Sequence, residues 1–543
     1  MIALETNQNL TFRVLGILLI STLLFFLYRT RTIKRVFLWG LFICFLPVFI
    51  YGSLVKSWYA VSHYSLFVLV PSLLVNTLLF AFFYKETKQA IDPKKRYTVF
   101  LKTKWGKLKI KNIKRGASII GAAGSGKTES VIYNFLQHFS KYSFCGIIHD
   151  YKDFELTEIA NPLFKDSGVD FYPISFDAIN YSYKANPIAP HYLESEEAVN
   201  EISKVLLDNL LEKKESGFSQ GSAKFFDDAV EGLISGLIWK LKTDFPQFCT
   251  LPHLITLYTS ADANTLIDFL SSNAIAKMMA NAFIKGKESE KQTAGILASL
   301  SNAFKKIATR KIFMVLSDDE VPLNINSAKN KAVVSLINNP KYETAYSPII
   351  ATLMHTIVKQ MSVRNQEPSF LMIEEAPTIR LLNMHRIPAT LRSYDISTIY
   401  VMQDKVQNDL LYGDKASKAI LSNLSYQFFG KANDPDTANY YERFFEIVKV
   451  KTKSINESYT LKFDTRITTG EKDVSKIRAF EFFKLKQGEF ITFSDGQEKK
   501  VQFKLQQIEK KMPEPIAQYT EKELQKNYDK IVREALSILN NVC

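Results

Sequence analysis

The chain contains the octapeptide Gly-Ala-Ala-Gly-Ser-Gly-Lys-Thr at positions 121–128, directly behind the apolar run 117–120. It is a complete Walker A pattern, Gly-x4-Gly-Lys-Ser/Thr, between a predicted strand and a predicted helix. Its glycines let the backbone turn N–H groups inward around phosphate oxygens, and the helix that follows points its positive end at the same anion. Lys127 is expected to reach the β- and γ-phosphates of ATP, and Thr128 to offer its hydroxyl to Mg²⁺. The residues predicted to bind the nucleotide are Gly121, Ala122, Ala123, Gly124, Ser125, Gly126, Lys127, Thr128 and Glu129.

Length and charge restrict the class of protein. At 543 residues the chain is long enough for several domains. A formal net charge of +14 indicates an acidic partner, either nucleic acid or anionic lipid. The four cysteines (44, 145, 249 and 543) are scattered, so the spacing indicates neither a zinc site nor a disulfide framework.

Three apolar stretches lie within the first 84 residues, at 14–28, 36–55 and 65–84. The third is long enough to cross a hydrocarbon core of about 30 Å as a helix. A cleaved signal peptide does not fit the first stretch, because its basic cluster follows the apolar run and no Ala-x-Ala site is present. The pattern therefore predicts membrane-spanning helices.

The distribution of basic residues predicts the orientation of these helices. Lys and Arg are frequent in 29–35 and after residue 84, whereas the loop 56–64 contains only Lys56 and His63. The positive-inside rule then predicts three crossings, with the N-terminus outside and everything beyond residue 84 in the cytoplasm. Two crossings is the alternative. The basic segment 85–116 fits an anchor for the inner leaflet, so the net charge is only weak support for DNA binding.

The cytoplasmic part alternates short apolar strands with helices, which predicts an α/β fold with a parallel sheet and a ligand at the strands' carboxyl ends. Strands are expected near 97–101, 108–110, 145–149, 169–174, 332–337, 370–373, 397–402, 427–430, 489–493 and 501–505. From 194 to 314 nearly everything is helical by pattern. The predicted regions are transmembrane (1–84), nucleotide-binding first part (85–193), all-helical insertion (194–315), nucleotide-binding second part (316–510) and C-terminal tail helix (511–543).

The strand 370–373 ends in Glu374-Glu375, which is typical of a Walker B motif. Glu375 is the candidate general base that polarises the attacking water. Glu374 is expected to hold Mg²⁺ through a coordinated water, although an Asp is usual there. Gln403 ends the next strand, where RecA-like ATPases sense the γ-phosphate. Arg392 is the candidate arginine finger for a neighbouring subunit, with Arg386 as its competitor.

Together these residues resemble one family, the TraG/TraD-like coupling ATPases of conjugative type IV secretion systems. The resemblance covers most of the chain, and two departures from the family pattern stand out. Glu374 replaces the usual Asp, and Asp-Pro-Lys-Gly-Glu is loosened to Asp-Tyr-Lys-Asp-Phe-Glu at 150–155. The matching motifs beyond the two nucleotide-binding ones are Asp150-Tyr151-Lys152, Asn186-Pro187, Phe225-Phe226-Asp227-Asp228-Ala229, Val401-Met402-Gln403-Asp404, Leu411-Tyr412-Gly413, residues 427–429 and Asp436-Thr437-Ala438.

The resemblance implies transmembrane helices followed by a RecA-like P-loop ATPase domain with an inserted all-α domain. It further implies a multi-pass protein of the bacterial inner membrane, a homo-hexamer with its ATPase domain in the cytoplasm and with ATP and Mg²⁺ as cofactors. Such a protein recruits single-stranded DNA with its relaxase and drives it to a type IV secretion channel. The helical insertion would recognise the substrate.

Two other functions fit the same motifs. An FtsK/HerA-like DNA translocase shares the core and the anchor, but residues 506–543 are too few for the winged-helix DNA reader such proteins usually carry. A tether for the relaxosome that binds nucleotide with little catalysis is supported only by Glu374. An ABC transporter does not fit, because the chain lacks the Leu-Ser-Gly-Gly-Gln signature.

Overall fold

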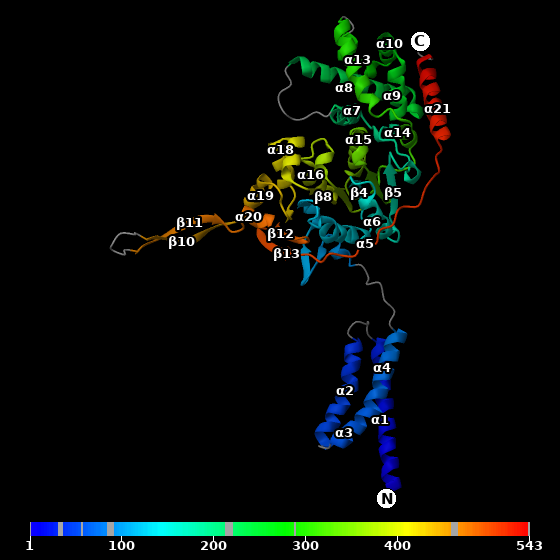
Figure 1. Ribbon diagram of the computed structural model, residues 1–543. Helices are drawn as coiled ribbons and strands as arrows, with labels where there is room; N and C mark the ends of the chain where they lie inside the picture. Colours follow the sequence, from blue (N-terminus) through cyan, green and yellow to red (C-terminus); the bar gives the residue numbers. More distant parts are fainter. Residues whose placement is uncertain are drawn as a thin grey trace. The chain divides into compact units, whose positions relative to one another are not determined.

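The computed structural model describes residues 2–30, 36–55, 58–83, 92–211, 221–286, 289–457 and 465–540. The chain divides into two compact units, 1–91 and 92–543 (Figure 1).

The first unit is a small helical bundle with an apolar exterior. Its elements are α1 (Ile2–Thr30), α2 (Val36–Val55), α3 (Trp58–Tyr64), a π-helical turn (Ser65–Leu69) and α4 (Val70–Phe83). Large apolar side chains such as Leu19, Phe49 and Phe82 face outward, whereas Ser72 and Asn76 are buried, and the Tyr28 hydroxyl donates to Asn76 Oδ1 over 2.8 Å. Apolar groups outside and polar groups inside are typical of a protein in lipid.

Within the described residues, one helix is long and apolar enough to cross a membrane, Val61–Phe83. The other apolar helices, Val14–Arg29 and Val36–Tyr51, are shorter. The expectation of three crossings is therefore not supported by helix length, although all three apolar stretches are helical.

The second unit is built around a sheet in which nine of the described strands pair in the order β13-β12-β9-β3-β8-β7-β4-β6-β5. The seven strands from β9 to β5 are parallel, and β12 and β13 add an antiparallel edge. The predicted α/β class is confirmed. The strands are β3 (Ala117–Ile120), β4 (Cys145–Asp150), β5 (Asp170–Ser175), β6 (Ala332–Ile337), β7 (Ser369–Ile373), β8 (Ile396–Met402), β9 (Tyr426–Phe429), β12 (Glu489–Ser494) and β13 (Gln497–Gln502).

Both faces of the sheet are covered, so its central strands are apolar throughout rather than alternating. On one face Ile119, Ile148 and Met372 pack with α5 and α6. On the other, Ile120, Ile147 and Ile373 belong to the core that includes α15. The helices of this region are α5 (Tyr133–Lys141), α6 (Glu155–Phe164), α15 (Glu343–Met361), α16 (Ile387–Leu391), α17 (Lys405–Tyr412), α18 (Asp414–Ser422), α19 (Pro435–Glu442) and α20 (Ala479–Phe483).

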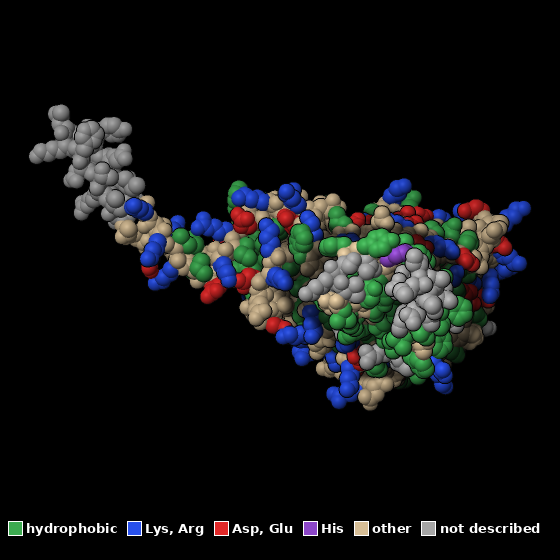
Figure 2. Space-filling model, turned by 90° about the horizontal axis from the view of Figure 1, so that it is seen from below, with side chains coloured by type: hydrophobic (Ala, Val, Ile, Leu, Met, Phe, Trp, Pro, Cys, Tyr) green, Lys and Arg blue, Asp and Glu red, His purple; other side chains and the backbone are tan. Residues whose placement is uncertain are grey.

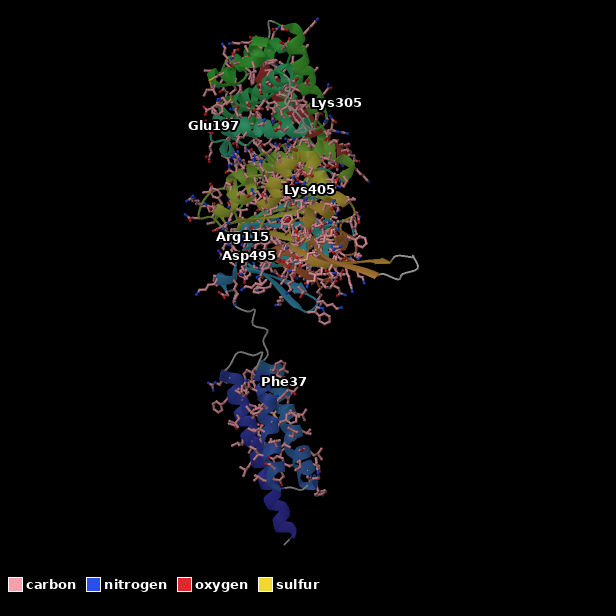
Figure 3. The ribbon with its side chains drawn as sticks, turned by 90° about the vertical axis from the view of Figure 1, so that its left-hand side faces the viewer. Phe37, Arg115, Glu197, Lys305, Lys405 and Asp495 are labelled. Carbon is pink, nitrogen blue, oxygen red and sulfur yellow. The ribbon has the colours of Figure 1, made fainter. Side chains whose placement is uncertain are left out.

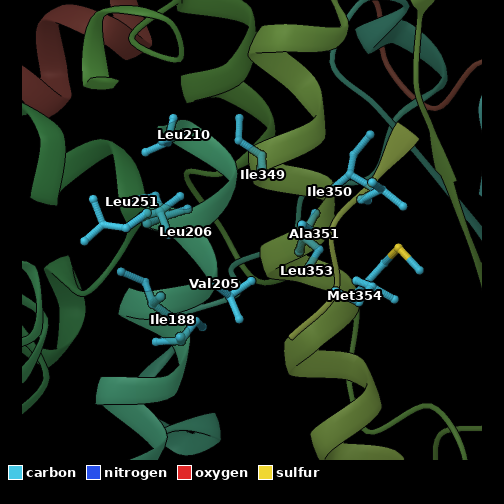
Figure 4. Close-up of a cluster of buried hydrophobic side chains, with 14 of the residues drawn as sticks. Ile188, Val205, Leu206, Leu210, Leu251, Ile349, Ile350, Ala351, Leu353 and Met354 are labelled. Carbon is cyan, nitrogen blue, oxygen red and sulfur yellow. The ribbon is translucent and has the colours of Figure 1, made fainter. Parts of the chain in front are cut away.

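Every described element between β5 and β6 is helical. These helices share one hydrophobic core with the sheet: Val205, Leu206 and Leu210 of α7 face Ile349 and Leu353 of α15 (Figure 4). The helices are α7 (Glu196–Leu210), α8 (Gly221–Asp244), α9 (Leu251–Ser260), α10 (Ala263–Ser271), α11 (Ala274–Met279), α12 (Asn281–Lys285), α13 (Glu290–Lys305) and α14 (Arg310–Val315). The last helix, α21 (Glu521–Asn540), packs against α9 and α14.

Two hairpins complete the unit. The first joins β1 (Val99–Thr103) to β2 (Gly106–Ile110), in the region where strands were predicted at 97–101 and 108–110. The second, β10 (Ile447–Glu457) with β11 (Thr465–Ser475), was not predicted, and it stands away from the body as an arm (Figure 1). The strand expected at 501–505 instead spans Gln497–Gln502, because it is the antiparallel partner of β12 and its register is set there.

Candidate nucleotide-binding site

The phosphate loop leaves β3 at Ile120 and enters a π-helical turn at Thr128. Gly124 and Gly126 have φ of +74° and +82°, a backbone conformation that a side chain strains. A Cβ on Gly126 would also lie 3.1 Å from the backbone nitrogen of Gly488. The loop therefore requires these glycines for conformation and, at Gly126, for space.

Lys127 folds back over the loop. Its ammonium group donates to the carbonyl oxygen of Gly121 and, over 3.4 Å, to that of Ala122. Burial lowers the pKa of Lys127, while the nearby carboxylates of Glu375 and Glu374 act in the opposite direction. A phosphate entering the loop would replace the two carbonyl groups as the partner of this lysine.

Backbone hydrogen bonds from three distant segments hold the loop. The amide of Gly121 donates to the carbonyl of Met402 (3.2 Å), and that of Ala122 to Lys431 (2.8 Å). The amide of Gly488 donates to the carbonyl of Ser125 (2.9 Å). The contributions of Lys431 and Gly488 were missed from the sequence, since neither lies in a nucleotide-binding pattern.

The Walker B acids lie at the same edge of the sheet. Glu374 and Glu375 follow β7 directly, and each is only 2% exposed. The backbone of Glu375 is left-handed, with φ of +44°, which is uncommon for a residue with a side chain. The side-chain nitrogen Nε2 of Gln403, at the end of β8, donates to Glu375 Oε1 over 3.0 Å. The structure thus brings Lys127, Glu374, Glu375 and Gln403 together, as predicted.

Lys152 joins the two acids. Its ammonium nitrogen lies 3.0 Å from Glu374 Oε1, 3.5 Å from Glu375 Oε1 and 3.8 Å from Glu155 Oε2. Burial alone would lower the pKa of Lys152, but Glu374 and then Glu375 outweigh burial and raise it. The sequence indicated Lys152 only as part of a family motif, without a role.

Burial dominates the charge state of Glu374. It raises the pKa of Glu374 to about 7, with Asp150 adding to the shift and Lys152 opposing it. Burial also raises the pKa of Asp150 to about 6, although the backbone amide and hydroxyl of Thr157 donate to its Oδ2 over 2.7 and 2.6 Å. The cluster is therefore poised to accept a cation.

The residues present fit Mg²⁺. Glu374 Oε2 is buried and has no hydrogen-bond partner among the described residues, and the Thr128 hydroxyl stands at the loop's end. No cluster of three or more His, Cys, Asp or Glu ligands is found in the described ranges. This suits an ion bound mainly by nucleotide phosphates and water with one or two protein oxygens.

Arg392 lies elsewhere. It precedes β8, whose first residues pair with the start of β7, whereas the loop pairs with the end of β8 at Met402. Seven residues of strand place about 23 Å between these two edges. The structure does not bring Arg392 or Arg386 to the nucleotide site of its own chain, and both are exposed.

Comparison with known proteins shows which proteins this chain and its site are similar to. Residues 368–478, which hold both acids and Gln403, match the family model described as the TraM recognition site of TraD and TraG. The solved structure of the bacterial conjugative coupling protein TrwBdeltaN70, unbound, aligns with a TM-score of 0.59 at 12% identity, over 76% of this chain and 90% of that one. The predicted resemblance to coupling proteins is confirmed.

The coupling-protein fold also appears in ligand-bound relatives. TrwB in complex with ADP and Mg²⁺ aligns with a TM-score of 0.57, and TrwB with a non-hydrolysable ATP analogue with 0.56. Each is 12% identical and covers 74% of this chain, with 88% and 87% of the relative covered. No curated protein matches the sequence. The likeness at this identity establishes a P-loop ATPase fold of the coupling-protein type.

Proposed function

We propose that this protein is an inner-membrane ATPase that couples a relaxase–DNA substrate to a conjugative type IV secretion channel. The observation that carries the proposal is the meeting of Lys127, Glu374, Glu375 and Gln403 at one edge of the sheet. That edge lies within a chain of coupling-protein fold.

Each residue has a proposed chemical role. The loop amides and Lys127 bind the phosphates, and Thr128 and Glu374 hold the magnesium shell. Magnesium, when bound, neutralises charge that develops on the transferring phosphoryl group. Glu375 accepts the proton of the attacking water, and Gln403 reports the state of the γ-phosphate through its hydrogen bond to Glu375.

The family model supports one of the proposed partners. Its description names recognition of TraM, which supports a relaxosome protein as a partner of this chain. We propose single-stranded DNA with its relaxase as the cargo, a homo-hexamer as the working form, and the helices between β5 and β6 as the substrate-recognition part.

The first unit is the proposed membrane anchor. Val61–Phe83 is the best supported span, and the basic segment after it supports a cytoplasmic position for the ATPase. Tyr59, 78% exposed, would then lie on the outer side. A cysteine at position 59, in a chain with Cys543 replaced, should react with an impermeant reagent added outside intact cells. Labelling only after lysis would reverse this topology.

ATP hydrolysis by the full-length protein in detergent tests the function. Single-stranded DNA should stimulate hydrolysis, and Lys127→Ala should abolish it, whereas Lys141→Ala on the exposed end of α5 should not. If the wild type is no faster than Lys127→Ala with or without DNA, the protein is not a motor. Stimulation by duplex DNA alone would favour a double-strand translocase instead.

A further inference from the structure

The turn after β4 holds Lys152 in a fixed place. Asp153 and Phe154 both have left-handed backbones, with φ of 48° and 71°. The amide of Asp153 donates to the carbonyl of Asn338 over 3.1 Å, and that of Asn338 donates to Asp150 over 2.8 Å. Because neighbouring strands fix this backbone, the lysine is directed at the acid pair by the fold.

Lys152 contacts one carboxylate oxygen of each acid and, among the described residues, leaves the other oxygen of Glu374 without a partner. It occupies Glu374 Oε1 and shares Glu375 Oε1 with Gln403. Within the described structure, Glu374 Oε2 is buried without a partner. Both acid side chains are 3% exposed, so water cannot replace the lysine as a partner without opening the site.

We propose that Lys152 is a positioning residue that holds Glu374 by one carboxylate oxygen and leaves the other for the magnesium shell of the bound nucleotide. The proposal rests on the proposed ATPase function. It assigns a task to a lysine whose partner acids come from a strand far away in sequence.

The presence of Glu at position 374 makes such a clamp more important. Glu has one more rotatable bond than the Asp expected there, so its carboxylate is less well fixed by the backbone. A charged hydrogen bond from Lys152 fixes the position of the Glu374 carboxylate. The family pattern has the same lysine beside an Asp, so in this chain compensation for the longer side chain is an added task of Lys152.

Magnesium linkage in ADP binding to the full-length protein in detergent tests the role. Titration calorimetry with ADP, with and without Mg²⁺, gives the gain in affinity that the ion confers. We expect Lys152→Met to leave Mg²⁺-free ADP binding within about twofold and to reduce the gain by about tenfold, the usual lower cost of losing a residue that orients a metal ligand. Lys152→Arg, which keeps the charge, should recover part of the gain.

Two results would overturn the role of Lys152. One is an unchanged magnesium gain in Lys152→Met. The other is an equal loss of ADP binding with and without the ion, which indicates a structural effect only. Lys165→Met, at the exposed end of α6, is the matched control and should behave as wild type. DNA-stimulated hydrolysis plays no part in this readout, so the transport function and the lysine's role can fail separately.

A double-mutant cycle tests the compensation itself. In a Glu374→Asp background the clamp should matter less, so Lys152→Met should reduce the magnesium gain by less than about threefold. Equal penalties in the two backgrounds would contradict the idea that Lys152 serves the longer side chain.

Discussion

The two buried acids after β7 differ in their partners, and this difference fits the different roles proposed for them. Glu375 accepts from Gln403 and lies 3.5 Å from Lys152, whereas Glu374 has Lys152 at 3.0 Å on one oxygen and an unpartnered second oxygen within the described structure. A base needs an oriented lone pair, and a metal-shell residue needs an open one. Individual hydrogen bonds at this site therefore separate two chemically identical groups.

Glu375→Gln should keep ATP binding and lose turnover. The amide has the same shape, but it cannot accept the proton of the attacking water, so hydrolysis should fall at least about 100-fold. Comparing ATP affinity by calorimetry with phosphate release measures both effects. Glu158→Gln on α6 is the control, and turnover within a few-fold of wild type in Glu375→Gln would remove Glu375 as the base.

His138 should make the protein acid-sensitive. It is buried on α5 with Nε2 2.7 Å from the carbonyl of Arg96, and burial lowers its pKa to about 4. Between pH 6.5 and 4 the unfolded chain binds the proton and the folded chain does not, so stability is lost as pH falls through this window. From pH 7 to 5 the loss is about 1–2 kcal/mol.

Denaturant unfolding at these two pH values, in wild type and His138→Gln, isolates this contribution. Glutamine does not titrate and can still donate to Arg96, so the variant should lose less stability than the wild type between pH 7 and 5. Equal losses would show that His138 is not the source.

At the scale of elements, segments from the C-terminal end of the chain contact both the nucleotide site and the helices between β5 and β6. Gly488 donates to the phosphate loop, and the ion pair of Arg115 with Asp495 joins the start of β3 to the β12–β13 turn (Figure 3). The segment beyond β13 then runs along the body, where the amide of Lys511 donates to Glu158 over 2.9 Å. It ends in α21, which covers the helices between β5 and β6.

Removing α21 by ending the chain after Thr520 should loosen α9 and α14 selectively. Leu524, Ile531 and Ile538 are buried in that contact, and each apolar side chain of this size contributes roughly 1.5–3 kcal/mol. Hydrogen exchange should become faster in α9 and α14 and stay slow in β3, β7 and β8. Uniformly faster exchange would mean that the unit unfolds as a whole.

The β10–β11 arm should be dispensable for folding. Its strands pair with each other, β10 contains Lys449 and Lys451, and Ile447 is 68% exposed. Figure 2 shows basic side chains along the arm. Replacing 449–473 by Asn-Gly joins Val448 and Val474, which already face each other, through a favourable two-residue turn. Unfolding free energy and ADP affinity should stay within about 0.5 kcal/mol of wild type, and a larger loss would show that the arm supports the body.

At the scale of the whole molecule, neither of the two predicted arginine fingers, Arg392 and Arg386, lies at the nucleotide site of its own chain. Arg392 is exposed at the amino edge of the sheet, beside the Lys114–Asp395 ion pair of 2.8 Å. From that position it can serve only another subunit's nucleotide. The proposed hexamer would supply that subunit.

Arg392→Ala should therefore keep ATP binding and slow hydrolysis. Arginine fingers contribute about 10³–10⁵ in rate, which is the largest loss expected here. Mixing it with Lys127→Ala should restore activity, because each variant supplies what the other lacks. Arg386→Ala, mixed in the same way, is the comparison. Absence of recovery in the Arg392 mixture would weaken its assignment as the finger.

The local patterns of the chain sufficed for the phosphate loop, the acid pair, Gln403 and most strands, including 332–337 to the residue. Buried parallel strands are short apolar runs, and the loop's chemistry needs a fixed spacing of residues. Both can therefore be predicted from residues that are neighbours in the sequence. The arm was missed although Val448-Lys449-Val450-Lys451 alternates apolar and basic residues. The two strands pair only with each other and bury no face in the core, so they lack the apolar run that identifies the strands of the main sheet.

Only the tertiary structure decided which distant groups meet. Lys152 between Glu374 and Glu375, Gly488 on the phosphate loop and Arg392 at the far edge all depend on strand order. Strand order is set by the packing of the whole core around the sheet, and no local spacing carries it. The sequence by itself predicted a nucleoside-triphosphate site in a chain that also has an apolar N-terminal region. The fold determined which side chains surround the acids that would use it.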